Sequence, residues 1–304
     1  MVSNVAVLLA AYNGEKWIEQ QITTILNQQG VDLHLYISLD LSADSTLNII
    51  NELSQQYPQI TVLPYGQRFG SAAPNFYHLL LNVPIENYDY IALSDQDDIW
   101  LEDKLKRAIN VLEAEKAFGY SSNVFAFWSN GKKKLIKKAY PQYKYDYLFE
   151  APGPGCTFVI KKELATDIKY FFGCKRDILI ELGYHDWLIY AFARSREYKW
   201  VIDNCALIEY RQHNNNQLGV NNGLKAFISR TRKALEGEVI EQVVKTICFL
   251  NIENEEFIKK WYKSNKIEYL KLAYFSKELR RKGKDRILFF CFCIISFLKE
   301  IHKK

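Results

Sequence analysis

The sequence contains few of the residues on which small, cross-linked proteins depend. Its 304 residues include six cysteines, seven prolines and one methionine. Except for Cys291 and Cys293, the cysteines lie far apart, with neither the density of a disulfide scaffold nor the spacing of a zinc site. We therefore expect reduced, mostly buried thiols, as in a protein of the cytoplasm.

Long apolar runs are also missing. The segment ILFFCFCIISFL, residues 287–298, has twelve residues, whereas a membrane-spanning helix needs ~20. Basic stretches flank it, so we interpret it as an interfacial helix on an anionic membrane surface, with a buried helix or a homo-oligomer contact as the alternative. The chain opens with strand-like residues and no secretory signal pattern, so we expect a cytoplasmic location, peripheral to the inner face of the cell membrane.

The charge is divided unevenly along the chain. Residues 224–304 carry 19 Lys and Arg against 10 Asp and Glu, whereas residues 1–223 carry 21 against 25. With 48% hydrophobic and 14% aromatic residues, the chain can bury a large core. We predict one domain over residues 1–223 and a basic helical extension over residues 224–304, with a hinge at NNNQLGVNNG, residues 214–223. We expect no nucleic-acid partner, because such a partner requires the basic surface on the folded domain.

The first half of the chain alternates between two periods. Continuous apolar runs, typical of strands covered on both faces, alternate four times with segments whose apolar residues have helical spacing. This pattern predicts an α/β fold, Rossmann-like, with a mostly parallel sheet and flanking helices. Ligands bind such sheets outside the carboxyl ends of the strands, where the sequence has polar clusters at residues 11–14, 40–45 and 94–98. A lysine-rich run at residues 132–138 is interpreted as a solvated loop.

Asp95, Asp97 and Asp98 form a dense carboxylate cluster directly after an apolar run. Carboxylates this close remain charged only when a cation or several hydrogen-bond donors compensate them. Oxygen ligands at this spacing suit Mg²⁺ or Mn²⁺, which keep several waters and bridge to substrate phosphates. Asp97 or Asp98 could instead cap a helix that begins after them, and one such cap is compatible with a metal site.

Five segments, in this order, resemble one known family. They are LLAAYNGEKWIEQQITTILNQ, ALSDQDDIWLEDKL, GPGCTFVI, YHDWLIYAFA and YRQHNNNQLG. Together they are similar to the family 2 glycosyltransferases of the GT-A fold, and most similar to the bacterial rhamnosyltransferase-like branch that builds surface polysaccharides. The resemblance covers about residues 4–219. The DQDDIW and HDW segments are its most specific parts, since a lone D-x-D is a weak signal.

The resemblance implies a donor site and a metal site. Asp95 and Asp97 match the aspartates that contact the donor ribose and hold the divalent cation on the nucleotide diphosphate. His213 matches a histidine that completes the metal shell or contacts the diphosphate. Asp40 matches a carboxylate that reads base or ribose, although Leu39 and Leu41 flank it where the family often has a second aspartate and a glycine. The implied nucleotide-sugar-binding residues are Ala11, Tyr12, Asn13, Asp40, Asn75, Asp95 and Arg211.

The resemblance also implies a catalytic residue. Asp186 stands at a predicted helix start, where the residue pattern alone indicates a helix cap. By resemblance it is the general base, which takes the proton of the acceptor hydroxyl on the face opposite the leaving diphosphate. Gly155, Cys156 and Trp187 are the implied acceptor-binding residues.

The expected function is therefore an inverting, metal-dependent sugar transfer from a nucleotide sugar to a growing cell-surface polysaccharide or lipid-linked glycan. The expected donor is dTDP-rhamnose, with a UDP-sugar as the alternative on the same fold. Two other classes stay open on the residues. A metal-dependent phosphoesterase or nucleotidyltransferase could use the carboxylates of DQDD without needing HDW, and a non-catalytic nucleotide-binding scaffold could tolerate Leu39 and Leu41.

Overall fold

The structure, a computed structural model, describes residues 2–213, 238–262 and 267–302. The chain divides into two compact units: Met1–Ala139 with Pro152–Asn216, and Tyr140–Ala151 with Gln217–Lys304. Residues 140–151 thus belong to the second unit, although in sequence they interrupt the first. The predicted hinge at residues 214–223, and with it the predicted domain boundary, lies outside the described residues.

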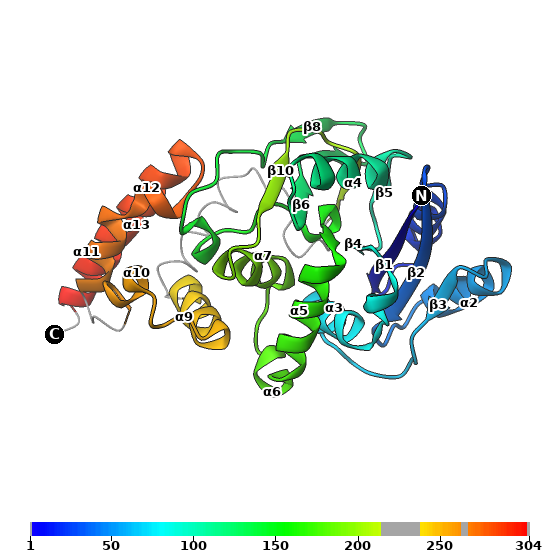
Figure 1. The fold of residues 1–304 in the computed structure, drawn as a ribbon, viewed down its shortest axis with the longest axis horizontal. Coiled ribbons are helices and arrows are strands. Elements are labelled where there is room, and N and C mark those ends of the chain that lie inside the picture. The colour runs from blue at the N-terminus through cyan, green and yellow to red at the C-terminus, as the bar shows by residue number, and fades with distance from the viewer. Residues whose placement is uncertain (1, 214–237, 263–266, 303–304) are drawn as a thin grey trace. The chain divides into compact units, whose positions relative to one another are not determined.

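A seven-stranded sheet forms the centre of the first unit (Figure 1). Its strands are β1 (Ser3–Ala11), β2 (Val31–Leu39), β3 (Ile60–Val62), β4 (Tyr90–Ser94), β6 (Gly119–Ser122), β9 (Val159–Lys161) and β10 (Trp200–Asp203). They lie in the order β10, β6, β9, β4, β1, β2, β3. β1 pairs in parallel with both β2 and β4, and residues 5–9 of β1 are fully buried. Only β9 runs antiparallel to its neighbours, β4 and β6.

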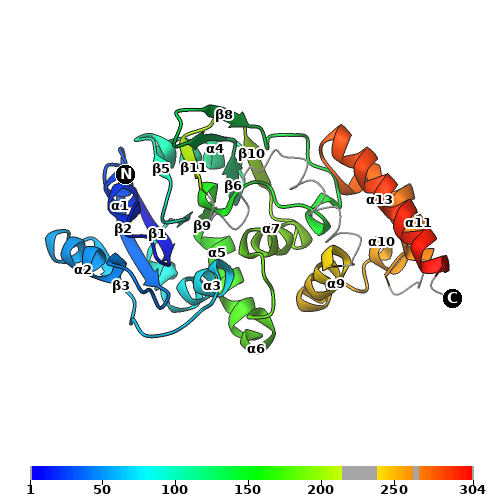
Figure 2. The same ribbon diagram turned by 180° about the vertical axis from the view of Figure 1, so that it is seen from behind.

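Helices cover the sheet (Figure 2). They are α1 (Ile18–Leu26), α2 (Thr46–Gln56), α3 (Ala72–Asn82), α4 (Lys104–Ala114), α5 (Lys162–Gly173), α6 (Arg176–Leu179) and α7 (His185–Ser195), with the short 3₁₀ turns η1 (Ile85–Asn87) and η3 (Gly155–Thr157). In α1, Ile18, Ile22 and Ile25 are buried, as their helical spacing predicts. α1 packs on α2, whereas α3, α5 and α7 pack on one another. The predicted α/β architecture with a mostly parallel sheet and flanking helices is confirmed.

A second, four-stranded sheet lies beside the first in this unit. Its strands are β5 (Ile99–Trp100), β7 (Val124–Trp128), β8 (Lys133–Ile136) and β11 (Ile208–Gln212), in the order β5, β11, β7, β8. The interpretation of residues 132–138 as a loop is wrong for residues 133–136, which pair antiparallel with β7. Lysines are well suited to an exposed edge strand, because they protect it from pairing with other chains.

The second unit is helical in the residues that the structure describes. It contains the turn η2 (Asp146–Leu148) and the helices α9 (Glu238–Leu250), α10 (Glu256–Lys259), α11 (Ile267–Tyr274), α12 (Ser276–Leu279) and α13 (Gly283–His302). Aromatic rings form its core: Trp261 is fully buried, and Phe149 lies 5.0 Å from Phe289 between ring centroids. Among these helices, none is both long enough and apolar enough to cross a bilayer.

Candidate active site

The loop between β4 and β5 presents the predicted carboxylate cluster. Antiparallel pairing of β5 with β11, in which Glu209 faces Ile99, brings the end of β11 alongside this loop. Asp98 is buried, and its Oδ1 accepts a 3.2 Å hydrogen bond from the backbone N–H of Arg211. The proposed helix-capping role of Asp97 or Asp98 is wrong, because β5 intervenes and α4 begins only at Lys104.

The end of β11 places two predicted residues beside Asp97. His213 Nε2 lies 2.6 Å from Asp97 Oδ2, and the imidazole stacks on Trp17 with ring centroids 4.2 Å apart. Arg211 donates through Nε to the carbonyl oxygen of Asp97 at 2.8 Å and through Nη2 to Gln20 Oε1 at 2.7 Å. The predicted metal-site residues Asp97 and His213 are therefore in direct contact, although 116 residues separate them in sequence.

Asp95 is partly buried at the first position of the cluster. Its pKa is raised to about 7, mainly by burial and further by the negative charges of Asp97 and Asp186. Burial, together with the negative charges of Asp97 and Asp95, also holds the pKa of Asp98 well above its usual range. Asp98 Oδ2 is buried and makes no hydrogen bond among the described residues. A cluster of this kind gains stability from a divalent cation, because the cation compensates carboxylates that otherwise repel one another.

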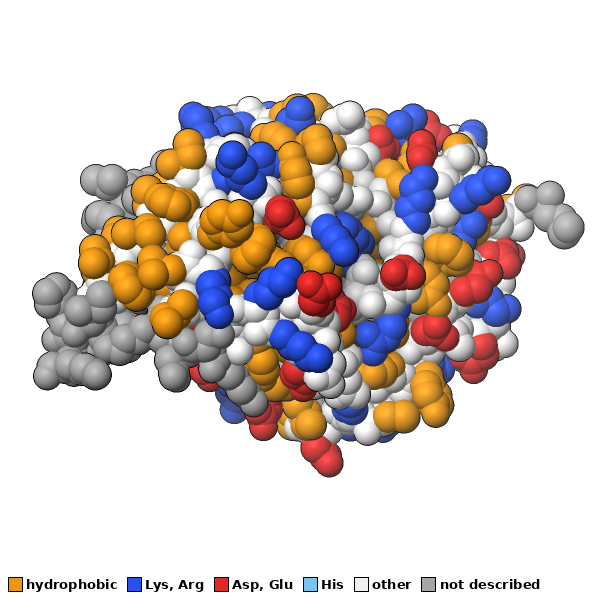
Figure 3. All heavy atoms as spheres, turned by 60° about the vertical axis from the view of Figure 1, so that its left-hand side comes forward, with side chains coloured by type: hydrophobic (Ala, Val, Ile, Leu, Met, Phe, Trp, Pro, Cys, Tyr) orange, Lys and Arg blue, Asp and Glu red, His pale blue; other side chains and the backbone are white. Residues whose placement is uncertain are grey.

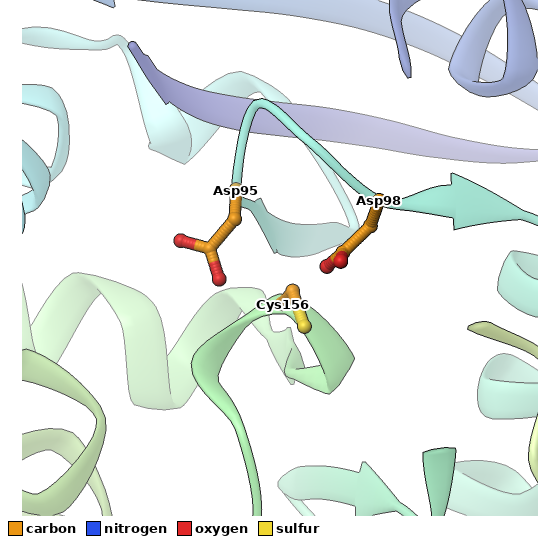
Figure 4. A group of neighbouring side chains, drawn as sticks. All are labelled: Asp95, Asp98 and Cys156. Carbon is orange, nitrogen blue, oxygen red and sulfur yellow. The ribbon is translucent and has the colours of Figure 1, made fainter. Parts of the chain in front are cut away.

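Cys156 lies beneath these carboxylates. Oxygens of Asp95 and Asp98 and the Cys156 sulfur lie within 4.8 Å of one another, and the side chains of both aspartates point toward Cys156 (Figure 4). Burial raises the pKa of the Cys156 thiol well above its usual range, so the thiol stays protonated. Because Cys156 is fully buried, it is not placed to contact an acceptor, contrary to the role that the resemblance implies.

The start of α7 contributes Asp186. Its Oδ1 accepts a 2.8 Å hydrogen bond from the backbone N–H of Trp187. Gly155 faces this turn so closely that a Cβ on it would lie 2.6 Å from His185 Nε2 and 3.4 Å from Asp186 Cβ. His185 stacks on Phe76 with centroids 4.0 Å apart, and burial lowers its pKa. Gly155 and Trp187, two predicted acceptor-binding residues, therefore lie next to the predicted base.

The predicted nucleotide loop follows β1. The ring of Tyr12 is about half exposed, and Asn13 has a left-handed backbone with φ of 45°. Asn13 Oδ1 accepts a hydrogen bond from the N–H of Ala43 at 2.9 Å, which holds the loop after β2. Asn75 donates to the carbonyl oxygen of Ala11 at 3.3 Å and to that of Ser38 at 3.1 Å, so it ties the ends of β1 and β2 together.

Asp40 has a structural use that sequence reasoning missed. Its carboxylate is buried and accepts three backbone hydrogen bonds, from Leu41 at 2.7 Å, Phe69 at 2.9 Å and Gly70 at 2.8 Å. Asp40 thereby anchors the loop after β3 to the end of β2.

Nearby, a pocket of about 300 Å³ opens beside the loops after β1 and β2. Its lining residues are Asn13, Glu15, Lys16, Trp17, Ala43 and Asp44.

Lys104 is a second residue that sequence reasoning missed. Its ammonium lies 3.4 Å from the centroid of the Trp100 ring and makes no hydrogen bond among the described residues. Burial lowers the pKa of Lys104 to about 7, and the nearby Asp98 and Cys156 oppose that shift. The only sequence feature that could have predicted the contact of Lys104 with Trp100 is their separation by four positions. That spacing is too common on helices to single out this pair.

Sequence comparison identifies the family. The sequence model described as Glycosyl transferase family 2 matches residues 6–183, more than half of the chain. The chain is 43% identical over 289 residues to the dTDP-rhamnosyl transferase RfbG of Shigella flexneri, which covers 95% of this chain and 99% of that protein. It is also 30% identical over 121 residues to the UDP-Glc:alpha-D-GlcNAc-diphosphoundecaprenol beta-1,3-glucosyltransferase WfaP of Escherichia coli, over 40% of this chain and 46% of that one.

Solved structures agree on the fold. The structure of Staphylococcus aureus TarS 1–349 in complex with UDP-GlcNAc matches with a TM-score of 0.56 at 13% identity, over 98% of this chain and 89% of that one. The mannosyltransferase PcManGT of Pyrobaculum calidifontis, in complex with GDP-Man and Mn²⁺, matches with a TM-score of 0.54 at 14% identity, over 100% and 88%. The fold is that of GT-A glycosyltransferases.

The chain therefore belongs to glycosyl transferase family 2, in its rhamnosyltransferase-like branch. It is a glycosyltransferase that acts in polysaccharide synthesis. Of the activities that the residues left open, membership of the family selects sugar transfer over phosphoester hydrolysis, nucleotidyl transfer and a scaffold without catalysis.

Proposed function

We propose that this enzyme transfers rhamnose from dTDP-rhamnose to a growing cell-surface polysaccharide or lipid-linked glycan, with inversion at the sugar carbon. Similarity to a dTDP-rhamnosyl transferase along 95% of the chain carries the choice of donor. The contact of Asp97 with His213 supports the chemistry, as does the closeness of Asp95 to Asp97 and Asp186, whose charges help to raise its pKa.

The residues present fit a divalent cation. Asp95, Asp97 and His213 supply the oxygen and nitrogen ligands that suit Mg²⁺ or Mn²⁺, and a nearby cation would favour the charged forms of Asp95 and Asp98, whose pKa values are raised without it. When bound, Mg²⁺ or Mn²⁺ supplies Lewis-acid stabilisation of the diphosphate leaving group. One carboxylate acting as base is then sufficient on the acceptor side.

Asp186 is the proposed base. Its carboxylate takes the proton of the acceptor hydroxyl as the hydroxyl oxygen forms a bond to the anomeric carbon. The bond from that carbon to the diphosphate breaks, and its electron pair leaves with dTDP. Gly155 packs closely against the turn that carries Asp186, and Trp187 follows Asp186 in the same helical turn, so these two residues are the proposed acceptor contacts. Ala11, Tyr12, Asn13, Asp40, Asn75 and Arg211 are the proposed donor contacts.

Membrane attachment suits a lipid-linked acceptor. Ile287, Leu288, Cys291, Ile295 and Leu298 of α13 are all exposed, and at 100° per residue they share one arc of ~100° on the helix. Figure 3 shows hydrophobic side chains gathered with lysines and arginines over the C-terminal helices. We propose that this apolar stripe binds anionic lipid at the inner face of the cell membrane.

A nucleotide panel tests the proposed donor. The protein is unfolded thermally with dTDP, UDP, GDP and their sugar conjugates, each with and without Mn²⁺ or Mg²⁺. A ligand that binds only the native state stabilises it by about 2.7 kcal/mol at a hundredfold excess over its Kd. We expect the largest metal-dependent shift with dTDP and dTDP-rhamnose. A larger shift with UDP would replace the proposed donor by a UDP-sugar, and no shift with any nucleotide would refute the proposed site.

A further inference from the structure

Gln96 makes a two-way contact between the carboxylate loop and the nucleotide loop. It lies between Asp95 and Asp97, and its Oε1 accepts a 2.7 Å hydrogen bond from the backbone N–H of Tyr12. Its Nε2 donates a 2.8 Å hydrogen bond to the carbonyl oxygen of the same Tyr12. The paired register of β1 and β4 ends at Leu9 and Ser94. Beyond that point, the Gln96 side chain takes the place of a strand partner.

Gly14 leaves the space that this side chain occupies. A Cβ on Gly14 would lie 2.4 Å from Gln96 Oε1 and 2.8 Å from Gln96 Cδ. Real Cβ atoms do not approach other atoms this closely, so alanine at position 14 and glutamine at position 96 cannot both keep their places. Residues 14 and 96 are thus matched to each other across two loops.

The same contact continues through the neighbouring loops. Asn13 follows Tyr12 and bonds to the loop after β2, with its N–H on Ser42 Oγ at 3.0 Å and its Oδ1 on the N–H of Ala43 at 2.9 Å. Asp40 then holds the loop after β3 through the N–H groups of Phe69 and Gly70. Side chains therefore link the loops after β4, β1, β2 and β3 in series, and Gln96 is the link that reaches the carboxylate cluster.

We propose that Gln96 is a positioning residue, which fixes the nucleotide-binding loop relative to the carboxylates that face the diphosphate. This inference rests on the proposed function of the same site. A glutamine suits the role because its neutral amide both donates and accepts. A glutamate could not donate to the Tyr12 carbonyl, and it would add another negative charge beside Asp95 and Asp97. Small displacements of binding groups lower affinity and rate steeply, so the link affects donor binding directly.

The test measures the Kd of dTDP by calorimetry in the presence of Mn²⁺, on the full chain. We expect Gln96→Ala to raise the Kd at least tenfold, and Gly14→Ala to do the same by displacing the intact Gln96 side chain. In the double variant the clash disappears, so the Kd should be no higher than in Gln96→Ala alone. This non-additivity identifies the contact itself, because independent sites would give additive effects.

Gln28 offers a matched control. It is a buried glutamine that also bridges backbone groups, accepting from the N–H of Leu105 at 3.0 Å and donating to the carbonyl oxygen of Leu101 at 2.9 Å. Gln28→Ala should lower the Tm at least as much as Gln96→Ala and leave the Kd of dTDP unchanged. An unchanged Kd in Gln96→Ala, or additive effects in the double variant, would overturn the inference. The proposed function would still stand in that case, provided that the wild-type chain bound dTDP. A wild-type chain that bound no nucleotide would overturn both.

Discussion

Asp186 is the residue on which the proposed chemistry depends most. General-base catalysis by a positioned side chain contributes about 10²–10⁴-fold to a rate. We therefore expect Asp186→Asn to reduce rhamnose transfer by that factor, measured as label incorporated from dTDP-rhamnose into a lipid-linked glycan fraction. The metal-dependent thermal shift with dTDP should persist, because Asn keeps the size of the side chain.

Asp177 provides the comparison for this variant. It is an exposed acidic residue in the first turn of α6, as Asp186 is an acidic residue in the first turn of α7. Asp177→Asn should leave transfer unchanged. Wild-type transfer rates in Asp186→Asn would remove the assignment of the base.

The raised pKa of Asp95 predicts an opposite pH dependence with and without metal. The folded pKa of Asp95 is about 7, against an ordinary value of 3.8, so the folded chain binds more protons than the unfolded chain between these values. Without metal, the free energy of unfolding should fall as the pH rises across this window. A divalent cation competes with the proton on Asp95, so the rise in Tm on adding Mn²⁺ should be small at about pH 5.5 and grow as the pH rises past about 7.

Thermal unfolding of Asp95→Asn checks both parts of this prediction. The variant lacks the titrating carboxylate and one proposed metal ligand, so its metal-free stability should vary less between about pH 4 and 7 and its Mn²⁺ shift should be lost. If the wild-type Mn²⁺ shift were as large at about pH 5.5 as at about pH 8, the proton and the metal would not share this site.

At the scale of elements, the sequence predicted what local periodicity controls. The runs of β1, β2, β3 and β4 and the helices after them were predicted, because each is read from residues a few positions apart. β8 and β5 were missed, since Lys133–Ile136 has no apolar alternation and β5 is only two residues long. Their pairing depends on partners far along the chain, such as the contact of Ile99 with Glu209.

In the candidate site, too, features set by neighbouring residues were predicted and features set by distant residues were not. The cluster of Asp95, Asp97 and Asp98 was visible because its members are adjacent in sequence. The contact of Asp97 with His213 could be expected only through family resemblance, since it arises from the pairing of β5 with β11. The sequence analysis expected mostly buried thiols, but no feature of the sequence placed Cys156 beneath the carboxylates, because a cysteine after a glycine is equally compatible with an exposed turn.

A buried ion pair fastens residues 140–151 into the second unit. Arg281 Nη1 lies 3.5 Å from Asp146 Oδ2, and both side chains are almost completely buried. Removing one member of such a pair costs about 3–5 kcal/mol, because the other charge is left uncompensated. We expect Arg281→Met to lower the free energy of unfolding of this unit by that amount in a urea titration.

Lys245→Met is the control for the ion pair. Lys245 pairs with Glu241 at 2.9 Å on the surface of α9, and both side chains are largely exposed. Exposed pairs of this spacing contribute about 0.5 kcal/mol or less, so the variant should unfold within that margin of the wild type. Equal losses in the two variants would mean that the Arg281 pair does not fasten the segment.

At the scale of the whole molecule, the proposed membrane attachment depends on the basic C-terminal segment. Residues 267–304 carry ten Lys and Arg against four Asp and Glu, and α13 exposes apolar residues between its basic flanks, with Ile287 67% and Leu298 48% exposed. Buried apolar area and attraction to anionic lipid act together in such helices, so binding should require both features. Each basic residue near the surface adds about 1 kcal/mol, an attraction that salt screens.

We expect the full chain to co-sediment with vesicles that contain phosphatidylserine, and less so with vesicles of phosphatidylcholine alone or at high salt. Ile287→Asp combined with Leu298→Asp should release the protein from anionic vesicles, because two carboxylates would then enter the lipid interface. Tyr170→Asp is the control, since Tyr170 on α5 is a large side chain that is also exposed, at 76%, but lies in the first unit. If the wild-type protein co-sedimented equally with vesicles that contain phosphatidylserine and vesicles of phosphatidylcholine alone, the lipid assignment would be contradicted. A dimer in analytical ultracentrifugation that the α13 substitutions dissociate would assign the stripe to a second copy of the chain.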